Sequence, residues 1–338
     1  MIVSRTPFRI SFFGGGTDYP SWFEKYKGSV ISTTIDKYLY LSVRYLPPFF
    51  SHRHRIVWSK VELVNKVLKV QHPLIREGLK MMGYDNDKIG FDIHYQSDLP
   101  ARSGMGSSSA FAVGLLKALH EISKKSISKK GIAYKAIELE RDILGEYVGS
   151  QDQVAAAYGG FNRINFKENH KIEVNKINVD KTRLSELDGK LMLFYTGLSR
   201  FASEIAESIV KRTDQNRSLL LNMQNIVDEA NSILISKTNL SDFGELLDES
   251  WHLKRKLSES VSSPKIDEIY KIAKENGALG GKILGAGGAG FMLFYVDQKH
   301  QIKIREALRN LLYVPFKFSN SGTRIIYNDN KDKFIKIS

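Results

Sequence analysis

The chain has 338 residues, no cysteine and a formal net charge of +13. This length is enough for one large domain or two medium ones. The lack of cysteine excludes disulfides, cysteine-ligated zinc and a cysteine nucleophile, and it favours a cytoplasmic location. The apolar runs are too short to cross a membrane, and the first residues do not resemble a signal peptide.

The excess of Lys and Arg is spread along the chain, apart from short clusters such as residues 52–55. No recognition helix, RNA-binding platform or zinc-finger pattern accompanies it. We therefore expect no nucleic-acid partner and no membrane partner. A solvated surface rich in lysine accounts for most of the charge, and an anionic small-molecule ligand would use the rest.

The first expected element is a strand over residues 3–13, in which large apolar side chains alternate with others. Arg9 falls on the face opposite three of these apolar groups. It is either a solvated edge residue or a cation directed into a site. Gly14–Gly16 then end the strand, and Asp18 in the turn is typical of an Asx turn or a helix cap. A short helix is expected from Ser21.

Four elements are expected over the next part of the chain. Residues 30–45 are aromatic and alternate, which indicates one strand or a hairpin, and residues 47–55 read as a basic loop. Residues 74–82 predict a helix that ends at Gly83, and residues 90–95 predict a strand.

The most informative stretch, Leu99–Ala110, reads LPARSGMGSSSA and lies between the strand at 90–95 and an apolar helix that continues to Ile122. Gly104 and Gly106 allow a tight turn and a close approach to a ligand. The free N–H groups of a helix start favour anions, so this turn suits a phosphate. Ser107–Ser109 could donate to phosphate or bind Mg²⁺. The alternative is a turn whose serines only cap the helix.

A helix is expected over residues 133–144. Counting 100° per residue places Glu140 near the centre of its apolar face, where a carboxylate needs a partner. That partner is either a buried cation or a metal ion in a cleft. Further on, Ser150–Gln153 resembles a capping box, so Asp152 would lie in the first turn of a short helix, where a negative charge is favoured anyway.

The second half of the chain follows a polar region at residues 162–183, and we expect two domains, 1–175 and 176–338. The remaining expected elements, in chain order, are a buried strand at 191–195, helices at 204–235, 241–258 and 264–276, a glycine-rich turn at 285–290, a strand at 291–296, a helix at 301–312 and a strand region at 314–327.

Three segments together resemble the GHMP kinase superfamily, which is named for galactokinase, homoserine kinase, mevalonate kinase and phosphomevalonate kinase. Pro7–Tyr19 (PFRISFFGGGTDY) is similar to its substrate motif, and Leu99–Ser109 to its phosphate loop. Lys282–Gly290 (KILGAGGAG) is similar to its C-terminal glycine-rich motif. The resemblance spans essentially the whole chain and implies an α+β fold in two parts, with the active site in the cleft between them.

The resemblance also implies roles for residues at matching positions. Asp152 would accept the proton of the substrate hydroxyl, and Arg9 would steady Asp152 and the transferring phosphoryl group. Mg²⁺ would bind Ser107 and Glu140. ATP would bind Pro100, Gly104, Met105, Gly106, Ser107, Ser108 and Ser109. The sugar would bind Gly15, Gly16, Thr17, Asp18, Asp152 and Arg200.

Within the superfamily, residues 8–20 resemble most closely the kinases that phosphorylate the anomeric hydroxyl of D-glycero-D-manno-heptose 7-phosphate. Gly15 and Gly16 replace a Glu-His pair of galactokinases, which removes bulk and a negative charge near the far end of the sugar. A sugar phosphate would then need a cation, for which Arg200 is the first choice and Arg102 and Lys27 are weaker ones. The alternative is a kinase for a free sugar, such as fucose, galactose or a uronic acid. A dimer is kept as one option for the assembly.

Overall fold

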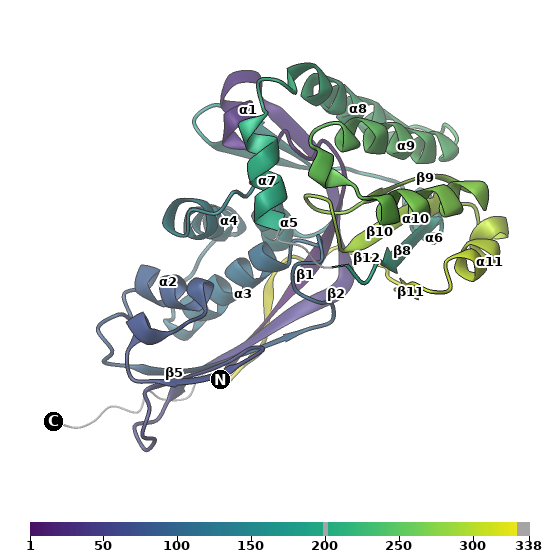
Figure 1. The fold of residues 1–338 in the computed structure, drawn as a ribbon. Helices are drawn as coiled ribbons and strands as arrows, with labels where there is room; N and C mark the ends of the chain where they lie inside the picture. Colours follow the sequence, from purple (N-terminus) through teal and green to yellow (C-terminus); the bar gives the residue numbers. More distant parts are fainter. Residues whose placement is uncertain (199–201, 330–338) are drawn as a thin grey trace.

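The structure, a computed structural model, describes residues 1–198 and 202–329. Within this part of the chain the strands form two sheets (Figure 1). The nine-stranded sheet contains β1 (Ile2–Phe13), β2 (Gly28–Leu46), β3 (His54–Val57), β4 (Val61–Val64), β5 (Gly90–Ser97), β6 (Asn162–Lys167), β7 (Lys171–Lys176), β12 (Phe318–Ser319) and β13 (Arg324–Asn328). The four-stranded sheet contains β8 (Leu191–Tyr195), β9 (Ala278–Ile283), β10 (Phe291–Val296) and β11 (Leu312–Tyr313).

The helices are divided between the two parts of the chain (Figure 1). The first part contains α1 (Pro20–Tyr26), α2 (Pro73–Met81), α3 (Ser107–Ile122), α4 (Lys129–Ile137), α5 (Gln151–Tyr158), the short 3₁₀-helix η1 (Val67–Lys69) and the short π-helix η2 (Glu138–Ile143). The second contains α6 (Lys181–Gly189), α7 (Ala202–Lys211), α8 (Arg217–Ile235), α9 (Ser241–Arg255), η3 (Glu259–Val261), α10 (Pro264–Glu275) and α11 (Gln298–Ala307). The expected mixture of helix and sheet is confirmed. None of the helices just named is both long and apolar enough to cross a membrane.

The long antiparallel pair of β1 and β2 is the central element of the fold, and it is paired from Ile2 opposite Val43 to Phe13 opposite Ile31. Their register shifts between Pro7 and Arg9, where the proline has no N–H to donate to the ladder. Residues 6–14 are all buried, on both faces of the strand. Arg9 is only 4% exposed, so it is not a solvated edge residue.

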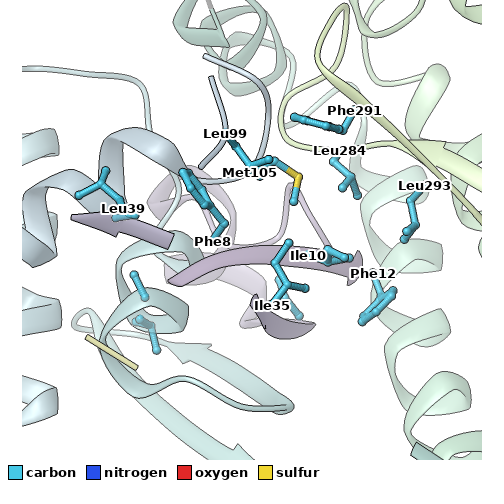
Figure 2. Close-up of a cluster of buried hydrophobic side chains, with 14 of the residues drawn as sticks. Phe8, Ile10, Phe12, Ile35, Leu39, Leu99, Met105, Leu284, Phe291 and Leu293 are labelled. Carbon is cyan, nitrogen blue, oxygen red and sulfur yellow. The ribbon is translucent and has the colours of Figure 1, made fainter. Parts of the chain in front are cut away.

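The hydrophobic core runs without a break from one part of the fold to the other. Figure 2 shows Met105 directed toward Leu284, with Phe8 and Ile10 of β1 on the N-terminal side. Phe12 lies toward the second sheet, close to Leu293 of β10 (Figure 2). Met105 of the first glycine-rich turn and Leu284 beside the second therefore belong to the same hydrophobic core.

Several expected boundaries differ from those of the structure. The helix expected over 204–235 is two helices, α7 and α8, because polar side chains between them bond to backbone: Thr213 to the carbonyl of Val210 and Asn216 to that of Leu257. The loop expected over 47–55 ends in β3, and β2 is one strand rather than a hairpin. The helix expected over 301–312 is α11, which begins three residues earlier.

Residues 318–328 belong to the first sheet, although they follow the second sheet in the sequence. Strand β13 pairs with β1, and β12 pairs with β2 near Thr34 and Ile35. Strands from near both ends of the sequence thus lie side by side in the first sheet. The division into domains between residues 175 and 176 stays a prediction.

Candidate active site

The two glycine-rich turns lie backbone against backbone. Gly104 has φ +79°, and a Cβ there would overlap the carbonyl oxygen of Leu284. Gly285 has φ +71°, and a Cβ there would meet the Cα of Gly104 at 2.5 Å. Only glycine allows both the left-handed backbone and this approach. The backbone of the second turn therefore limits where the backbone of the first turn can lie.

The first turn leads directly into α3. Gly106 is the N-cap of the helix and has φ +74°, so no side chain caps the first turn. The hydroxyl of Ser107 accepts a hydrogen bond of 3.1 Å from the backbone N–H of Arg102, inside the loop. The alternative in which the serines only cap the helix is therefore wrong, and the positive end of α3 is left open toward an anion.

Arg9 joins this loop to Asp152. Its guanidinium donates to both carboxylate oxygens of Asp152, at 2.8 and 2.6 Å, and to the carbonyl oxygen of Gly104, at 2.7 Å. This is the two-point geometry that fixes a carboxylate most firmly. The side chain of Arg9 is 5% exposed and that of Asp152 is 23% exposed, so the carboxylate is the accessible member of the pair.

Asp152 lies in the first turn of α5, as expected, but the expected capping box is wrong. Ser150 is the N-cap and makes no side-chain capping bond, because its backbone has helical dihedral angles rather than extended ones. Its N–H donates instead to the carbonyl of Asp18. The helix start is thus held by the turn after β1 rather than by its own side chains.

Asp18 is buried beside this pair. Its carboxylate accepts the N–H of Gly16 at 3.1 Å and that of Gln151 at 3.3 Å. Burial, together with the negative charge of Asp152, raises the pKa of Asp18 to about 6. A Cβ at position 149 would overlap the Asp18 carboxylate, which explains the glycine there.

The remaining residues of this turn have different surroundings. The hydroxyl of Thr17 donates to backbone carbonyl oxygens of Gly14 and Ser29, so it closes the turn instead of facing a ligand. A Cβ at Gly15 would meet only side-chain atoms at 3.8 Å, whereas Gly16, with φ +106°, lies against Leu220. Neighbouring side chains, those of Gln151 and Ser11, would therefore be in ordinary van der Waals contact with a Cβ at position 15.

Replacing Asp18 by Asn should change how stability depends on pH. A folded-state pKa above the unfolded value means that the folded protein binds the extra proton, so the contribution of Asp18 to stability falls as the pH rises from about 4 to above 6. The free energy of unfolding of D18N relative to wild type should therefore increase over this range by about 3 kcal/mol. Urea unfolding at pH 4 and pH 7 measures it; a constant difference would contradict the raised pKa.

Glu140 is fully buried in η2, the short π-helix that continues α4. Its Oε2 accepts hydrogen bonds from the Ser109 hydroxyl at 2.7 Å and from the Gln153 amide at 2.6 Å. Oε1 has no partner. Burial raises the pKa of Glu140 to about 7, although the hydroxyls of Ser108 and Ser109 and the amide of Gln153 act in the opposite direction.

These contacts bear on the two partners considered for Glu140. Among the residues that the structure describes, no cation forms an ion pair with Glu140, so none of them is the buried cation of that alternative. The unpartnered Oε1 is an oxygen donor of the kind that Mg²⁺ binds. The described residues contain no group of three or more His, Cys, Asp or Glu side chains suited to a metal. A magnesium ion here would take its other ligands from phosphates and water, as is usual for Mg²⁺.

Some predicted site residues lie apart from these contacts. Ser108 and Ser109 interact with Glu140, whereas the hydrogen bond that the structure gives the Ser107 hydroxyl comes from the backbone N–H of Arg102, so the pairing of Ser107 with Glu140 stays a prediction. Met105 is buried in the core, and its carbonyl accepts the N–H of Arg9. Pro100 is exposed where the loop begins. Arg200 lies outside the described residues.

Sequence reasoning missed three residues of this site. Lys254 and Lys282 are buried lysines behind the glycine-rich turns, and Gln153 bonds to Glu140. Lys282 begins the third motif and could have been noticed there. Lys254 has no local signal, because it looks like an ordinary polar position of α9.

The arrangement is that of a phosphoryl-transfer site: a helix start for phosphates, a held carboxylate and a second buried carboxyl group. Known proteins agree with this. The family model for the GHMP kinases N terminal domain matches residues 63–160, and that for the GHMP kinases C terminal domain matches residues 215–314. The chain belongs to the GHMP kinase family, whose members use ATP, and it is a sugar kinase.

Three relatives show which members of the family this chain resembles. D-glycero-alpha-D-manno-heptose 7-phosphate kinase of Campylobacter jejuni is 30% identical over 96% of this chain and 98% of its own length. The crystal structure of a D-glycero-D-manno-heptose 1-phosphate kinase from Bacteroides thetaiotaomicron has a TM-score of 0.73 at 27% identity, over 97% of this chain and 100% of that one. A bifunctional fucokinase/GDP-fucose pyrophosphorylase of Arabidopsis thaliana is 25% identical over 88% of this chain and 30% of its own length.

Proposed function

We propose that this kinase transfers the γ-phosphoryl group of ATP to the C1 hydroxyl of D-glycero-D-manno-heptose 7-phosphate and forms the 1,7-bisphosphate. The product would supply nucleotide-activated heptose for surface polysaccharides. The observation that carries the proposal is the position of Arg9, which holds Asp152 by two bonds and the phosphate loop by a third. One guanidinium thereby fixes the proton acceptor relative to the phosphates.

In this mechanism the protein positions its substrates and neutralises charge. Asp152 orients the C1 hydroxyl and accepts its proton, and Arg9 keeps the carboxylate in place while negative charge develops on the phosphoryl group. The N–H groups at the start of α3, with Gly104, Gly106 and Ser108, would hold the phosphates. Glu140 and Ser107 are the predicted ligands that would hold Mg²⁺, and the ion would neutralise negative charge on the phosphates.

The choice of substrate rests on two observations. The names of two relatives specify a heptose phosphate, although they place the phosphate at different ends of the sugar. The second is that Gly15 places no side-chain bulk or charge beside Gln151 and Ser11, which suits a longer or anionic sugar, with Asp18 accepting a hydrogen bond from a sugar hydroxyl. Arg200 remains the proposed cation for the terminal phosphate. The alternative is a free sugar, which the fucokinase relative favours.

A coupled ADP-release assay with Mg²⁺ and ATP separates these alternatives. The panel holds heptose 7-phosphate, mannose 6-phosphate, mannose, fucose, galactose and glucuronate. We expect turnover with the two terminally phosphorylated sugars and at least a hundredfold lower kcat/KM for the free ones. A preference for a free sugar would overturn the substrate and keep the reaction. We further propose a cytoplasmic location, a division into domains at residues 175 and 176, and no nucleic-acid partner.

A further inference from the structure

Two lysines are buried directly behind the glycine-rich turns. Lys254 of α9 is 5% exposed, and its ammonium group donates to the carbonyl oxygens of Ile283, at 3.0 Å, and Gly285, at 2.6 Å. Lys282 of β9 is 3% exposed and donates to the carbonyl of Phe12 at 2.6 Å. Among the described residues neither lysine forms an ion pair with a carboxylate.

Such an arrangement does not favour stability. Burial, with the nearby positive charges of Lys282 and Arg9, holds the pKa of Lys254 well below its usual range. Burial and the charge of Arg9 likewise lower the pKa of Lys282 to about 7. An apolar side chain of similar length would avoid this cost of desolvation. We therefore attribute the presence of a lysine at position 254 to its hydrogen bonds with the two carbonyl groups.

Those carbonyl groups belong to the turn that supports the phosphate loop. Lys254 bonds to Gly285, and the backbone of Gly285 lies against Gly104. The carbonyl of Gly104 in turn accepts a hydrogen bond from Arg9. A continuous series of contacts thus runs from α9 through both turns to the guanidinium that holds Asp152.

We propose that Lys254 is a positioning residue for the nucleotide. Its hydrogen bonds to both ends of the segment 283–285 fix the position of the second glycine-rich turn. Because this turn packs against the phosphate loop, Lys254 also fixes the backbone conformation of that loop. This rests on the proposed function, because the loop is taken to bind ATP. Without the clamp, Gly285 can move away from Gly104, and the N–H groups at the start of α3 lose their alignment. Within the described residues, the hydrogen bonds of Lys254 go to the second turn, and those of the Asp18 carboxylate come from Gly16 and Gln151.

The test compares Lys254→Met, which keeps the length and loses the donors, with Lys254→Gln, which keeps one donor group. Lys256→Met is the matched control, since Lys256 is an exposed lysine at the end of the same helix. We expect K254M to raise KM for ATP at least tenfold while KM for the sugar changes less than twofold. K254Q should lie between K254M and wild type, and K256M should match wild type.

A purely structural role would lower Tm and leave both KM values unchanged, and that result would overturn the proposal, as would an equal rise in both. Titration with ADP, followed by calorimetry, gives the same comparison without turnover. If wild type phosphorylates no sugar, the proposed function fails; a tenfold weaker ADP affinity of K254M would still support Lys254. If K254M does not fold, the same measurements are made on K254Q. A KM for ATP equal to that of wild type in K254Q would then contradict the proposal.

Discussion

Asp152→Asn is expected to lower kcat by about a thousandfold, because the amide cannot accept the proton of the attacking hydroxyl. The substitution keeps the shape of the side chain, and its oxygen can still accept from Arg9, so the loop at Gly104 should stay in place. The affinity for nucleotide should therefore remain within about threefold of wild type. Steady-state kinetics and titration with ADP measure the two quantities.

Asp214→Asn is a suitable control for D152N, since Asp214 is an exposed carboxylate whose one ion pair, to Lys25, lies at the surface. It should have wild-type kinetics. Turnover by D152N within tenfold of wild type would show that Asp152 does not receive the proton, and a large loss of ADP affinity would show that it acts mainly on the loop.

Gly104→Ala should reduce kcat/KM for ATP on the order of a hundredfold, because a misplacement of about 1 Å is enough to produce such a loss. The new methyl group would overlap the carbonyl oxygen of Leu284, so one of the two turns must move. Movement of the loop also pulls on Arg9 through its bond to the Gly104 carbonyl. Kinetics with varied ATP and fixed sugar measure the effect.

Gly83→Ala separates this overlap from backbone strain. Gly83 has φ +78°, almost the same as Gly104, but a Cβ there meets nothing within 4 Å. Its cost should be only the strain of a left-handed alanine, about 1 kcal/mol in unfolding free energy, with unchanged KM for ATP. Equal kinetic losses in both variants would contradict the role given to the contact between the turns.

Local patterns predicted the elements whose sequences carry a clear period or a clear cap. The strand expected over 3–13 and the helix expected from residue 264 are confirmed as β1 and α10, and Ser263 accepts the N–H of Ile266 at the start of α10. The angular count found that Glu140 is buried. It could not show that its partners are Ser109 and Gln153, because these contacts join segments that are far apart or separated by a helix break.

What the sequence left open depends on contacts between distant segments. Arg9 could be a surface residue or a site residue until α5 and the phosphate loop were seen to cover it. Residues 212–216 interrupt a continuous apolar period, since Asn216 bonds to a carbonyl 41 residues away. The role of Lys254 depends on its hydrogen bonds to the turn at 283–285, which lies far from it in the sequence. No period or spacing within one segment contains this information.

The most direct test of the account is ³¹P NMR of the products formed from ATP with heptose 7-phosphate and, separately, with heptose 1-phosphate. We expect the 7-phosphate signal to persist while a new sugar phosphate signal appears, coupled to the anomeric proton, as ATP becomes ADP. The 1-phosphate should not react. A new signal coupled to the C7 methylene protons, or turnover of the 1-phosphate alone, would contradict phosphoryl transfer to C1.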